Sequence, residues 1–279
     1  MPKEPITQAD LEEFVANESD FGFEMKIRRL LTSKSLDPLH GGTYIDPVTG
    51  LSRQFDLRVQ IRPQERHYRR CPFLFRLAIE CKNVRDHYPL LIQCVPRARN
   101  ESFHDVVATT NRTARVLRFY PRETKYREDR PTGKNLMQVA RNGSAFNASD
   151  GDVYSKWAQA IASSSDLAVS SEANLEESPI FTFVMPVLVV PDGRLWAINY
   201  DEHGSALGAP TLSEAISFFV SAPLRWKHKD EILAMTLSHI EFVTETGLSR
   251  LIDSLKSPIA VNEYFEDSLV NRYLSSNDW

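Results

Sequence analysis

Two carboxylates and one amine lie in strand-like runs of this sequence, at positions that allow them to share a site. Asp56 lies in residues 54–61, and Glu80 and Lys82 close the hydrophobic run 73–82. Side chains two residues apart on a strand point to the same face, so Glu80 and Lys82 are expected roughly 7 Å apart. Carboxylates of this kind can hold Mg²⁺, and a nearby amine can orient or deprotonate water. The set is the minimum for metal-assisted hydrolysis.

The Glu-x-Lys triplet alone carries little information, because two more copies occur in the chain. Glu24-Met25-Lys26 lies on a predicted helix, and Glu123-Thr124-Lys125 lies in a polar, Arg-rich stretch. Only the triplet that ends at Lys82 closes a hydrophobic strand and has an upstream aspartate on a second strand. The context therefore selects Asp56, Glu80 and Lys82 as the candidate site.

The order of these segments resembles the catalytic half of the PD-(D/E)XK, or restriction-endonuclease-like, nuclease superfamily. The resemblance covers residues 14–83 and is carried by a helix with Phe23-Glu24, a hairpin, the strand Phe55-Asp56-Leu57 and the strand ending Ile79-Glu80-Cys81-Lys82-Asn83. Residues 154–200 supply a helix and two strands in the order that this core needs. Phe55 stands where the family name has proline, a change that the superfamily tolerates.

The resemblance implies a metal ion at this site, Mg²⁺ with Mn²⁺ able to substitute. Asp56 and Glu80 are its expected ligands, and the resemblance adds the backbone carbonyl of Cys81 and the carboxylate of Glu24. Lys82 is the expected catalytic amine, which would orient the attacking water and offset charge in the transition state.

Ordinary structural roles compete with these assignments. Glu24 could be a surface residue that pairs with Arg28 one helical turn later. Lys82 could simply reach solvent from the end of a strand. The thiol of Cys81, as distinct from its carbonyl, is expected to be a small buried apolar group.

Two polar residues of a later helix, Tyr154 and Gln159, resemble side chains that some members of the superfamily place near the scissile phosphate. Their alternative is an exposed helix surface. The histidines near the site in sequence are expected to be surface or loop residues, since none forms a His-x-x-x-His pair; they are His40, His67, His87 and His104. Neither a glycine-rich phosphate loop nor a Gly-x-Ser-x-Gly elbow is present, so nucleotide hydrolysis and acyl transfer lack support.

Composition indicates a globular protein with a substantial core. The chain has 279 residues, of which 42% are hydrophobic, and its sequence predicts neither a membrane-spanning helix nor a secretory signal. Its three cysteines, an odd number without metal-site spacing, argue against a disulfide framework and favour the reducing cytoplasm.

The net charge of −4 conceals a basic region. Residues 58–130 contain 17 Lys and Arg against 8 Asp and Glu, whereas the rest of the chain is strongly acidic. A basic surface next to the candidate site is typical of nucleic-acid binding, and Arg112, Arg115 and Arg118 are the predicted phosphate contacts. The alternatives are a solvated surface without a ligand, or arginines that pair with acidic residues of the chain or of an oligomer.

Hydrophobic periodicity and turn residues predict the secondary structure. Asp10 is the expected N-cap of the first helix, and residues 103–110 are the expected helical start of an insertion whose fold the sequence leaves open. The expected elements are helices at 11–16 and 21–31, a hairpin over 41–61, a polar loop at 62–70, strands at 73–82 and 88–95, a helix from 152, strands at 180–190 and 195–200 joined by a hairpin turn, a helix at 212–220, a strand at 239–244 and a helix from about 248 to 255.

These elements predict a single α/β domain with a mixed central sheet flanked by helices. A restriction-endonuclease-like core would span about 14–83 and 152–200, with an insertion at about 96–151 after the catalytic strand and an α/β extension at about 205–279 that continues the sheet. The predicted function is Mg²⁺-dependent hydrolysis of phosphodiester bonds, with DNA the preferred partner, no membrane partner, and a homodimer compatible with double-strand cutting. The alternative is a non-cleaving protein of the same fold that binds nucleic acid or protein.

Overall fold

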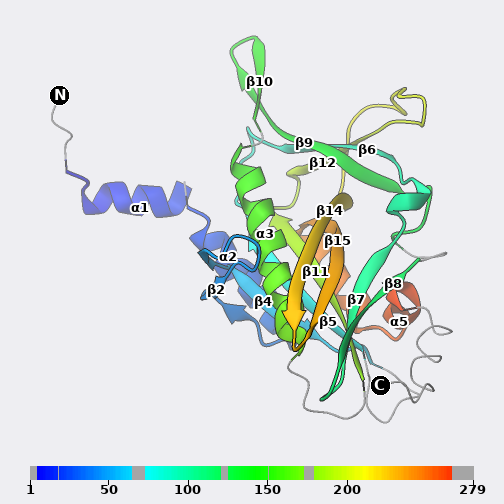
Figure 1. The fold of residues 1–279 in the computed structure, drawn as a ribbon. Coiled ribbons are helices and arrows are strands. Elements are labelled where there is room, and N and C mark those ends of the chain that lie inside the picture. Colours follow the sequence, from blue (N-terminus) through cyan, green and yellow to red (C-terminus); the bar gives the residue numbers. More distant parts are fainter. Residues whose placement is uncertain are drawn as a thin grey trace.

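A large mixed β-sheet forms the body of the protein, with helices on its faces (Figure 1). The computed structural model describes residues 5–17, 19–64, 73–120, 125–149, 151–172 and 179–265. Within them the main sheet has 13 strands, both parallel and antiparallel. The predicted fold class, mixed α/β with a central sheet flanked by helices, is confirmed at this level.

The main sheet combines strands from every part of the chain. Its strands are β1 Leu39–His40, β4 Leu57–Ile61, β5 Phe73–Cys81, β6 Leu90–Pro96, β7 His104–Thr109, β8 Ala114–Phe119, β9 Pro131–Asn142, β10 Ala145–Ser149, β11 Ile180–Val190, β12 Leu195–Asn199, β13 Thr211–Leu212, β14 Ala215–His228 and β15 Glu231–Thr244. The main path is β1-β4-β5-β11-β15-β14-β9-β6-β12-β13, with β7, β8 and β10 paired beside it. A separate hairpin joins β2 Thr43–Ile45 to β3 Ser52–Gln54.

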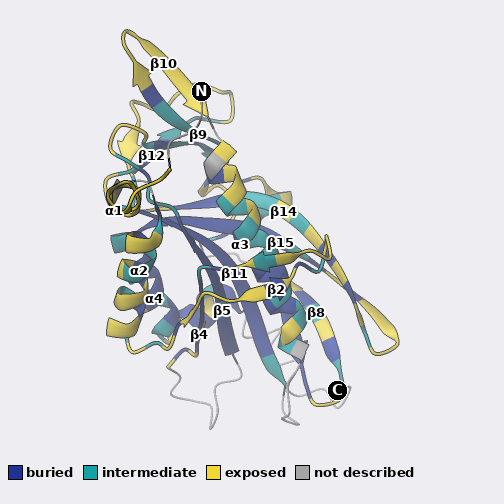
Figure 2. Ribbon diagram, turned by 90° about the vertical axis from the view of Figure 1, so that its left-hand side faces the viewer, coloured by how far each residue is buried: buried dark blue, intermediate teal, exposed yellow. Residues whose placement is uncertain are grey.

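Three parallel strands form the centre of the sheet. β11 pairs in parallel with β5 on one side and with β15 on the other, and β4 continues the sheet antiparallel to β5. All of β11 except its first residue is buried, which its unbroken apolar run requires of a strand covered on both faces (Figure 2). The carboxyl group of Glu80 is buried within this apolar centre.

Helices cover the two faces of these central strands. On one face, α2 Phe21–Ser33, α4 Glu245–Lys256 and α5 Ile259–Tyr264 pack against side chains that include Val187 and Val189. On the other, α3 Gly151–Val169 packs against the alternating residues Leu188 and Val190 (Figure 1). The side chain of Glu80 points to the face covered by α3. Its neighbours Ile79 and Cys81 point to the opposite face, which α2 and α4 cover.

Most of the predicted elements are confirmed. The helices at 11–16, 21–31, 152 onward and 248–255 correspond to α1 Gln8–Asn17, α2, α3 and α4, and the hairpin and the strands at 73–82, 88–95 and 239–244 also form. The C-terminal residues extend the same sheet through β14 and β15, as expected. The polar loop predicted at 62–70 lies largely outside the described residues.

The expected N-cap of α1, Asp10, is wrong. The helix begins earlier, and Thr7 performs the capping: its hydroxyl accepts from the backbone N–H of Asp10 at 3.3 Å. The carboxylate of Asp10 accepts in return from the backbone N–H of Thr7 at 2.7 Å. This reciprocal arrangement is a capping box, with the acidic residue at its third position.

The expected hairpin between 180–190 and 195–200 is also wrong. Both strands form, but β11 is flanked by β5 and β15, whereas β12 pairs in parallel with β6 and antiparallel with β13. Residues 191–194 therefore connect two distant parts of the sheet. Residues 191–194 favour a turn by their own conformational preferences. Which strands pair with β11 depends instead on burial of both faces of that strand.

Two predicted helices are strands. Residues 103–110 contain β7, which is buried throughout and pairs with both β8 and β11. Residues 212–220 contain the start of β14, whose long antiparallel pairing with β15 outweighs any local helical spacing. The insertion at 96–151 thus contributes strands β7 to β10 to the main sheet.

Two elements project from the body: helix α1 and the hairpin of β9 and β10 (Figure 1). Their surfaces are largely exposed in Figure 2, and β10 has no buried residue. None of the helices in the described ranges has the length and apolar character needed to cross a membrane.

Candidate active site

Asp56 and Glu80 meet at the carboxyl end of β5. The antiparallel register pairs Leu57 with Ile79, which brings the residue before β4 opposite the residue after Ile79. The backbone N–H of Asp56 donates to Glu80 Oε1 at 3.4 Å, and the backbone N–H of Cys81 donates to Asp56 Oδ2 at 2.8 Å. The predicted pairing of these two carboxylates across neighbouring strands is therefore present.

A tight turn positions Asp56. The backbone N–H of Gly41 donates to the Asp56 carbonyl at 2.9 Å, and that of Phe55 donates to the Gly42 carbonyl at 3.2 Å. Gly42 has φ +129°, and a Cβ on it would lie 2.9 Å from Cζ of Phe55. Glycine is therefore required where this turn approaches the Phe55 ring.

Lys156 of α3 binds both carboxylates, and sequence reasoning missed it. Its ammonium donates to Asp56 at 2.8 and 3.1 Å and lies 3.6 Å from Glu80 Oε2. A signal existed, since Lys156 follows Val153 by three residues and precedes Ala160 by four, on the buried face of the helix. A lysine at such a position needs a buried partner.

Burial and mutual charge shape the electrostatics of this group. Burial, together with the charge of Asp56, raises the pKa of Glu80 from 4.5 to about 9, although the nearby Lys156 acts in the opposite direction. Burial lowers the pKa of Lys156, but the carboxylates of Asp56 and Glu80 outweigh it, and the net pKa lies above the ordinary lysine value. Glu80 therefore retains its proton at neutral pH unless another cation joins the site.

The start of α2 adds further charged groups. Burial and then the Asp56 charge raise the pKa of Glu24, which places this carboxylate within electrostatic reach of the pair. Glu24 lies 3.7 Å from His40, whereas the alternative partner Arg28 is exposed. Lys82 lies 3.7 Å from Asp20, whose carboxylate also accepts from the backbone N–H of Asn83 at 2.8 Å. Lys82 thus points toward the beginning of α2.

The carboxylate oxygens at this site provide part of the coordination that a hard divalent cation requires. Glu80 is 1% exposed, and its Oε2 accepts no hydrogen bond among the described residues. A divalent cation at this site would take the place of the Glu80 proton, and Mg²⁺ commonly takes one or two carboxylates and completes its shell with water. Within the described ranges, no three His, Cys, Asp or Glu side chains form a complete metal cage. Asp56 and Glu80 would therefore be the protein ligands, with Glu24 farther out.

The remaining predicted site residues are less closely associated. The thiol of Cys81 is fully buried in the core, as expected. Tyr154 is exposed and packs edge-on against Trp157, which matches its helix-surface alternative. Gln159 is half-buried, and its backbone carbonyl lies 3.5 Å from the hydroxyl of Tyr44.

His104 departs from its predicted surface position. It lies in β7, is fully buried, and its Nε2 is 2.5 Å from the Tyr264 carbonyl. Burial lowers the pKa of His104 to about 4, so the ring is neutral. His40 and His87 are exposed, as predicted, and His67 lies outside the described residues.

Several basic residues of the region 58–130 contact the protein itself. Arg58 binds Asp166, Arg97 is fully buried, and Lys125 binds Glu241. Arg118 forms a bidentate ion pair with Asp105 at 2.7 and 2.9 Å. The alternative of internal pairing therefore describes part of this region, and nucleic-acid binding by it stays a prediction.

The three predicted phosphate contacts lie on strands and a turn, not on a helix. Arg112 is exposed in the turn between β7 and β8, and its carbonyl accepts from Lys229. Arg115 is exposed on β8, and Arg118 is on the same strand. Residues three apart on a strand point to opposite faces, so Arg115 and Arg118 do not form the helical pair considered from sequence.

Arg118→Met is expected to lower the free energy of unfolding by about 1–2 kcal/mol, because it leaves the buried carboxylate of Asp105 without its cation. Arg112→Met, in the neighbouring turn, is the matched control and should change it by less than about 0.5 kcal/mol. Denaturant titration measures both. Unchanged stability of the Arg118 variant, with a reduced salt dependence of DNA binding, would return Arg118 to the phosphate-binding role.

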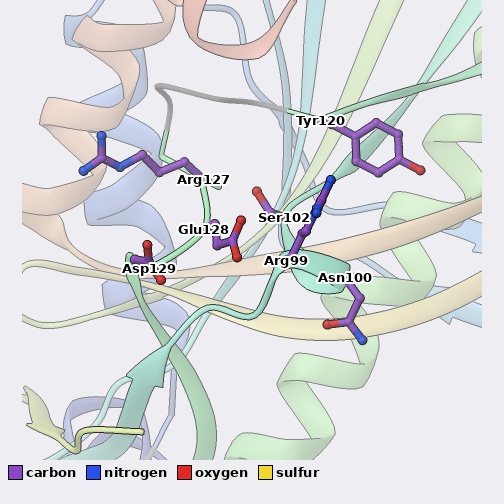
Figure 3. A pocket seen from close by; sticks show the side chains of 7 residues that line it. All are labelled: Arg99, Asn100, Ser102, Tyr120, Arg127, Glu128 and Asp129. Atoms are coloured by element: carbon purple, nitrogen blue, oxygen red, sulfur yellow. The ribbon is translucent and has the colours of Figure 1, made fainter.

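A cleft of about 1240 Å³ lies elsewhere, between residues 99–102 and 127–129 (Figure 3). Among the described residues, its charged lining consists of Arg99, Arg127, Glu128 and Asp129. The cleft contains none of the carboxylates of the candidate site.

Glu80→Gln should change how stability depends on pH. The folded protein retains the Glu80 proton up to about pH 9, whereas an unfolded chain releases it near 4.5, so this group reduces stability as pH rises between these values. Glutamine removes the dependence. We expect a Tm at least about 2 °C above wild type at pH 8, and little difference at pH 4. Equal differences in Tm at both pH values would contradict a raised pKa.

Comparison with known protein families, with curated proteins and with solved structures found no match to this chain. The functional assignment therefore depends on the residues of the site.

Proposed function

We propose that this protein is a divalent-metal-dependent nuclease of the restriction-endonuclease-like kind, which hydrolyses phosphodiester bonds, with DNA as its expected substrate. The observation that carries the proposal is the contact between Asp56 and the buried Glu80 at the end of β5, with a cationic group between them. Isolated buried carboxylates are unfavourable in a hydrophobic sheet, so a pair of them next to an apolar strand favours a functional role.

The arrangement of elements supports the same proposal. α2, the β2–β3 hairpin, β4 and β5 come first, and α3 and β11 follow after the intervening strands β6 to β10, in the order that the resemblance implies. β11 returns beside β5 in parallel after the α3 crossover. This topology brings a helix of distant sequence over the carboxylates, where it can contribute to the site.

Each residue has a proposed role. When bound, Mg²⁺ would activate water and neutralise charge on the scissile phosphate. Asp56 and Glu80 provide the hard oxygen ligands, and Glu24 and the Cys81 carbonyl are proposed as further ones. Lys82, next to Asp20 at the start of α2, is proposed to orient the attacking water. DNA-directed specificity would require base contacts, which phosphate-facing charge does not provide.

A non-cleaving protein of the same fold is the second candidate. Lys156 pairs with Asp56 and lies 3.6 Å from Glu80, as a purely structural ion cluster would require. Such a protein would bind nucleic acid or another protein through its surface and have no need of a metal.

Cleavage of supercoiled plasmid, linear DNA and RNA of the same sequence separates the two candidates. We expect nicked or linear plasmid with Mg²⁺ or Mn²⁺ and intact plasmid with EDTA. Light scattering of the same sample would show whether a homodimer forms, as double-strand cutting favours. DNA binding without cleavage in any divalent metal would support the non-cleaving alternative.

A further inference from the structure

The ammonium of Lys156 lies between the two carboxylates that the proposed function assigns to a metal. It lies 2.8 Å from Asp56 Oδ2 and 3.6 Å from Glu80 Oε2. Glu80 Oε2 is buried and accepts no hydrogen bond within the described residues. Lys156 is therefore the cation that lies between the two carboxyl groups in the observed state.

A divalent ion and this ammonium cannot both lie between the carboxylates. Mg²⁺ and Ca²⁺ lie roughly 2.0–2.6 Å from their oxygen ligands. An ion that contacts both Asp56 and Glu80 would thus lie where the ammonium of Lys156 does. Two cations at such a distance repel strongly in a partly buried site.

Lys156 can leave without movement of its helix. The stem of a lysine is flexible, and the side chain of Lys156 is 18% exposed, so it has a route to solvent. α3 is held independently on β4, because Arg58 donates to Ser163 at 3.0 Å and to Asp166 at 2.7 Å. Rotation of one side chain would open the space between the carboxylates.

We propose that Lys156 is a built-in, exchangeable counter-ion of the candidate metal site: it holds Asp56 and Glu80 together without metal and must be displaced when a divalent cation binds. The inference rests on the proposed function for the identity of the metal ligands. In this proposal, metal affinity depends on α3 as well as on the two strands, because the ammonium of Lys156 competes with the metal ion for the carboxylates.

Accessibility of Lys156 in the wild-type chain provides one test. Reductive methylation followed by mass spectrometry reports how readily each lysine amine reacts, with and without Mn²⁺. We expect methylation of Lys156 to rise severalfold at saturating Mn²⁺, while Lys34, whose ammonium pairs with Asp253, stays constant. Protection of Lys156 that is unchanged by bound Mn²⁺ would overturn the proposal.

Mn²⁺ affinity in a matched pair of variants provides the second test, by calorimetry on proteins whose folding is checked by circular dichroism. Lys156→Met removes the competing ammonium and should tighten Mn²⁺ binding by about tenfold or more. Lys82→Met removes the same charge nearby without a contact to Asp56 or Glu80, and should have a much smaller effect. Asp56→Asn should abolish binding.

The outcomes separate this inference from the proposed function. Equal or weaker Mn²⁺ binding by Lys156→Met would overturn the counter-ion role, and loss of binding in Asp56→Asn would still uphold the metal site. If Lys82→Met tightened Mn²⁺ binding as much as Lys156→Met, removal of any nearby positive charge would explain the effect, and the counter-ion role would be overturned. Binding by Lys156→Met without DNA cleavage would uphold the counter-ion role and count against the nuclease. Absence of binding in every variant would reject both.

Discussion

Asp56→Asn is expected to reduce Mg²⁺-dependent DNA cleavage by at least about a thousandfold, because it removes the charge of one of the two carboxylates proposed as metal ligands. The fold should persist. The amide oxygen of asparagine can still accept from the backbone N–H of Cys81, which lies 2.8 Å from Asp56 Oδ2. Initial rates of plasmid nicking, compared with the unfolding midpoint of the same sample, measure the two effects separately.

Asp86→Asn is the matched control, because its carboxylate is exposed and binds Arg194 at the surface. Its cleavage rate should equal that of wild type. Glu80→Gln should lose activity as fully as the Asp56 variant, since the two are the proposed ligands of one ion. Near wild-type cutting by either active-site variant would remove this pair from the catalytic machinery.

Arg58→Met is expected to produce the largest loss of stability, about 3 kcal/mol in the free energy of unfolding. The guanidinium is almost fully buried, binds Asp166 and Ser163 of α3, and lies 4.2 Å from the centre of the Phe55 ring. Its removal leaves the Asp166 carboxylate unpaired and loosens α3 from β4. Denaturant unfolding gives the value directly.

A double-mutant cycle with Asp166→Asn isolates the ion pair from the lost packing of Arg58. The second substitution should recover part of the stability, because it removes the unpaired charge. Arg28→Met, on the exposed side of α2, should change stability by less than about 0.5 kcal/mol. Additive effects of the two substitutions would show that Arg58 stabilises the chain through its ring contacts and its hydrogen bonds to Ser163, without a contribution from the Asp166 pair.

Local sequence determined the pairing of the two central carboxylates. Alternation along 54–61 and 73–82 predicted two strands, and strands that follow each other along the chain commonly lie side by side in a sheet. The antiparallel register brings Asp56 opposite Glu80, and both the strands and the contact are present. The helices α2, α3 and α4 were predictable for the same reason, since each has a regular apolar stripe that one face of a sheet can bury.

Tertiary structure alone decided which distant groups complete the site. Lys156 reaches Asp56 across 100 residues of sequence, and only the parallel return of β11 beside β5 places α3 over the carboxylates. The same long-range pairing turned 212–220 into part of β14 and separated β11 from β12. Periodicity in the sequence indicates which face of a segment is apolar. Which strands lie next to that segment is determined by the burial of both faces of the whole sheet. The sequence therefore determined the two strands and their carboxylates, whereas packing of the whole sheet selected the cation between them.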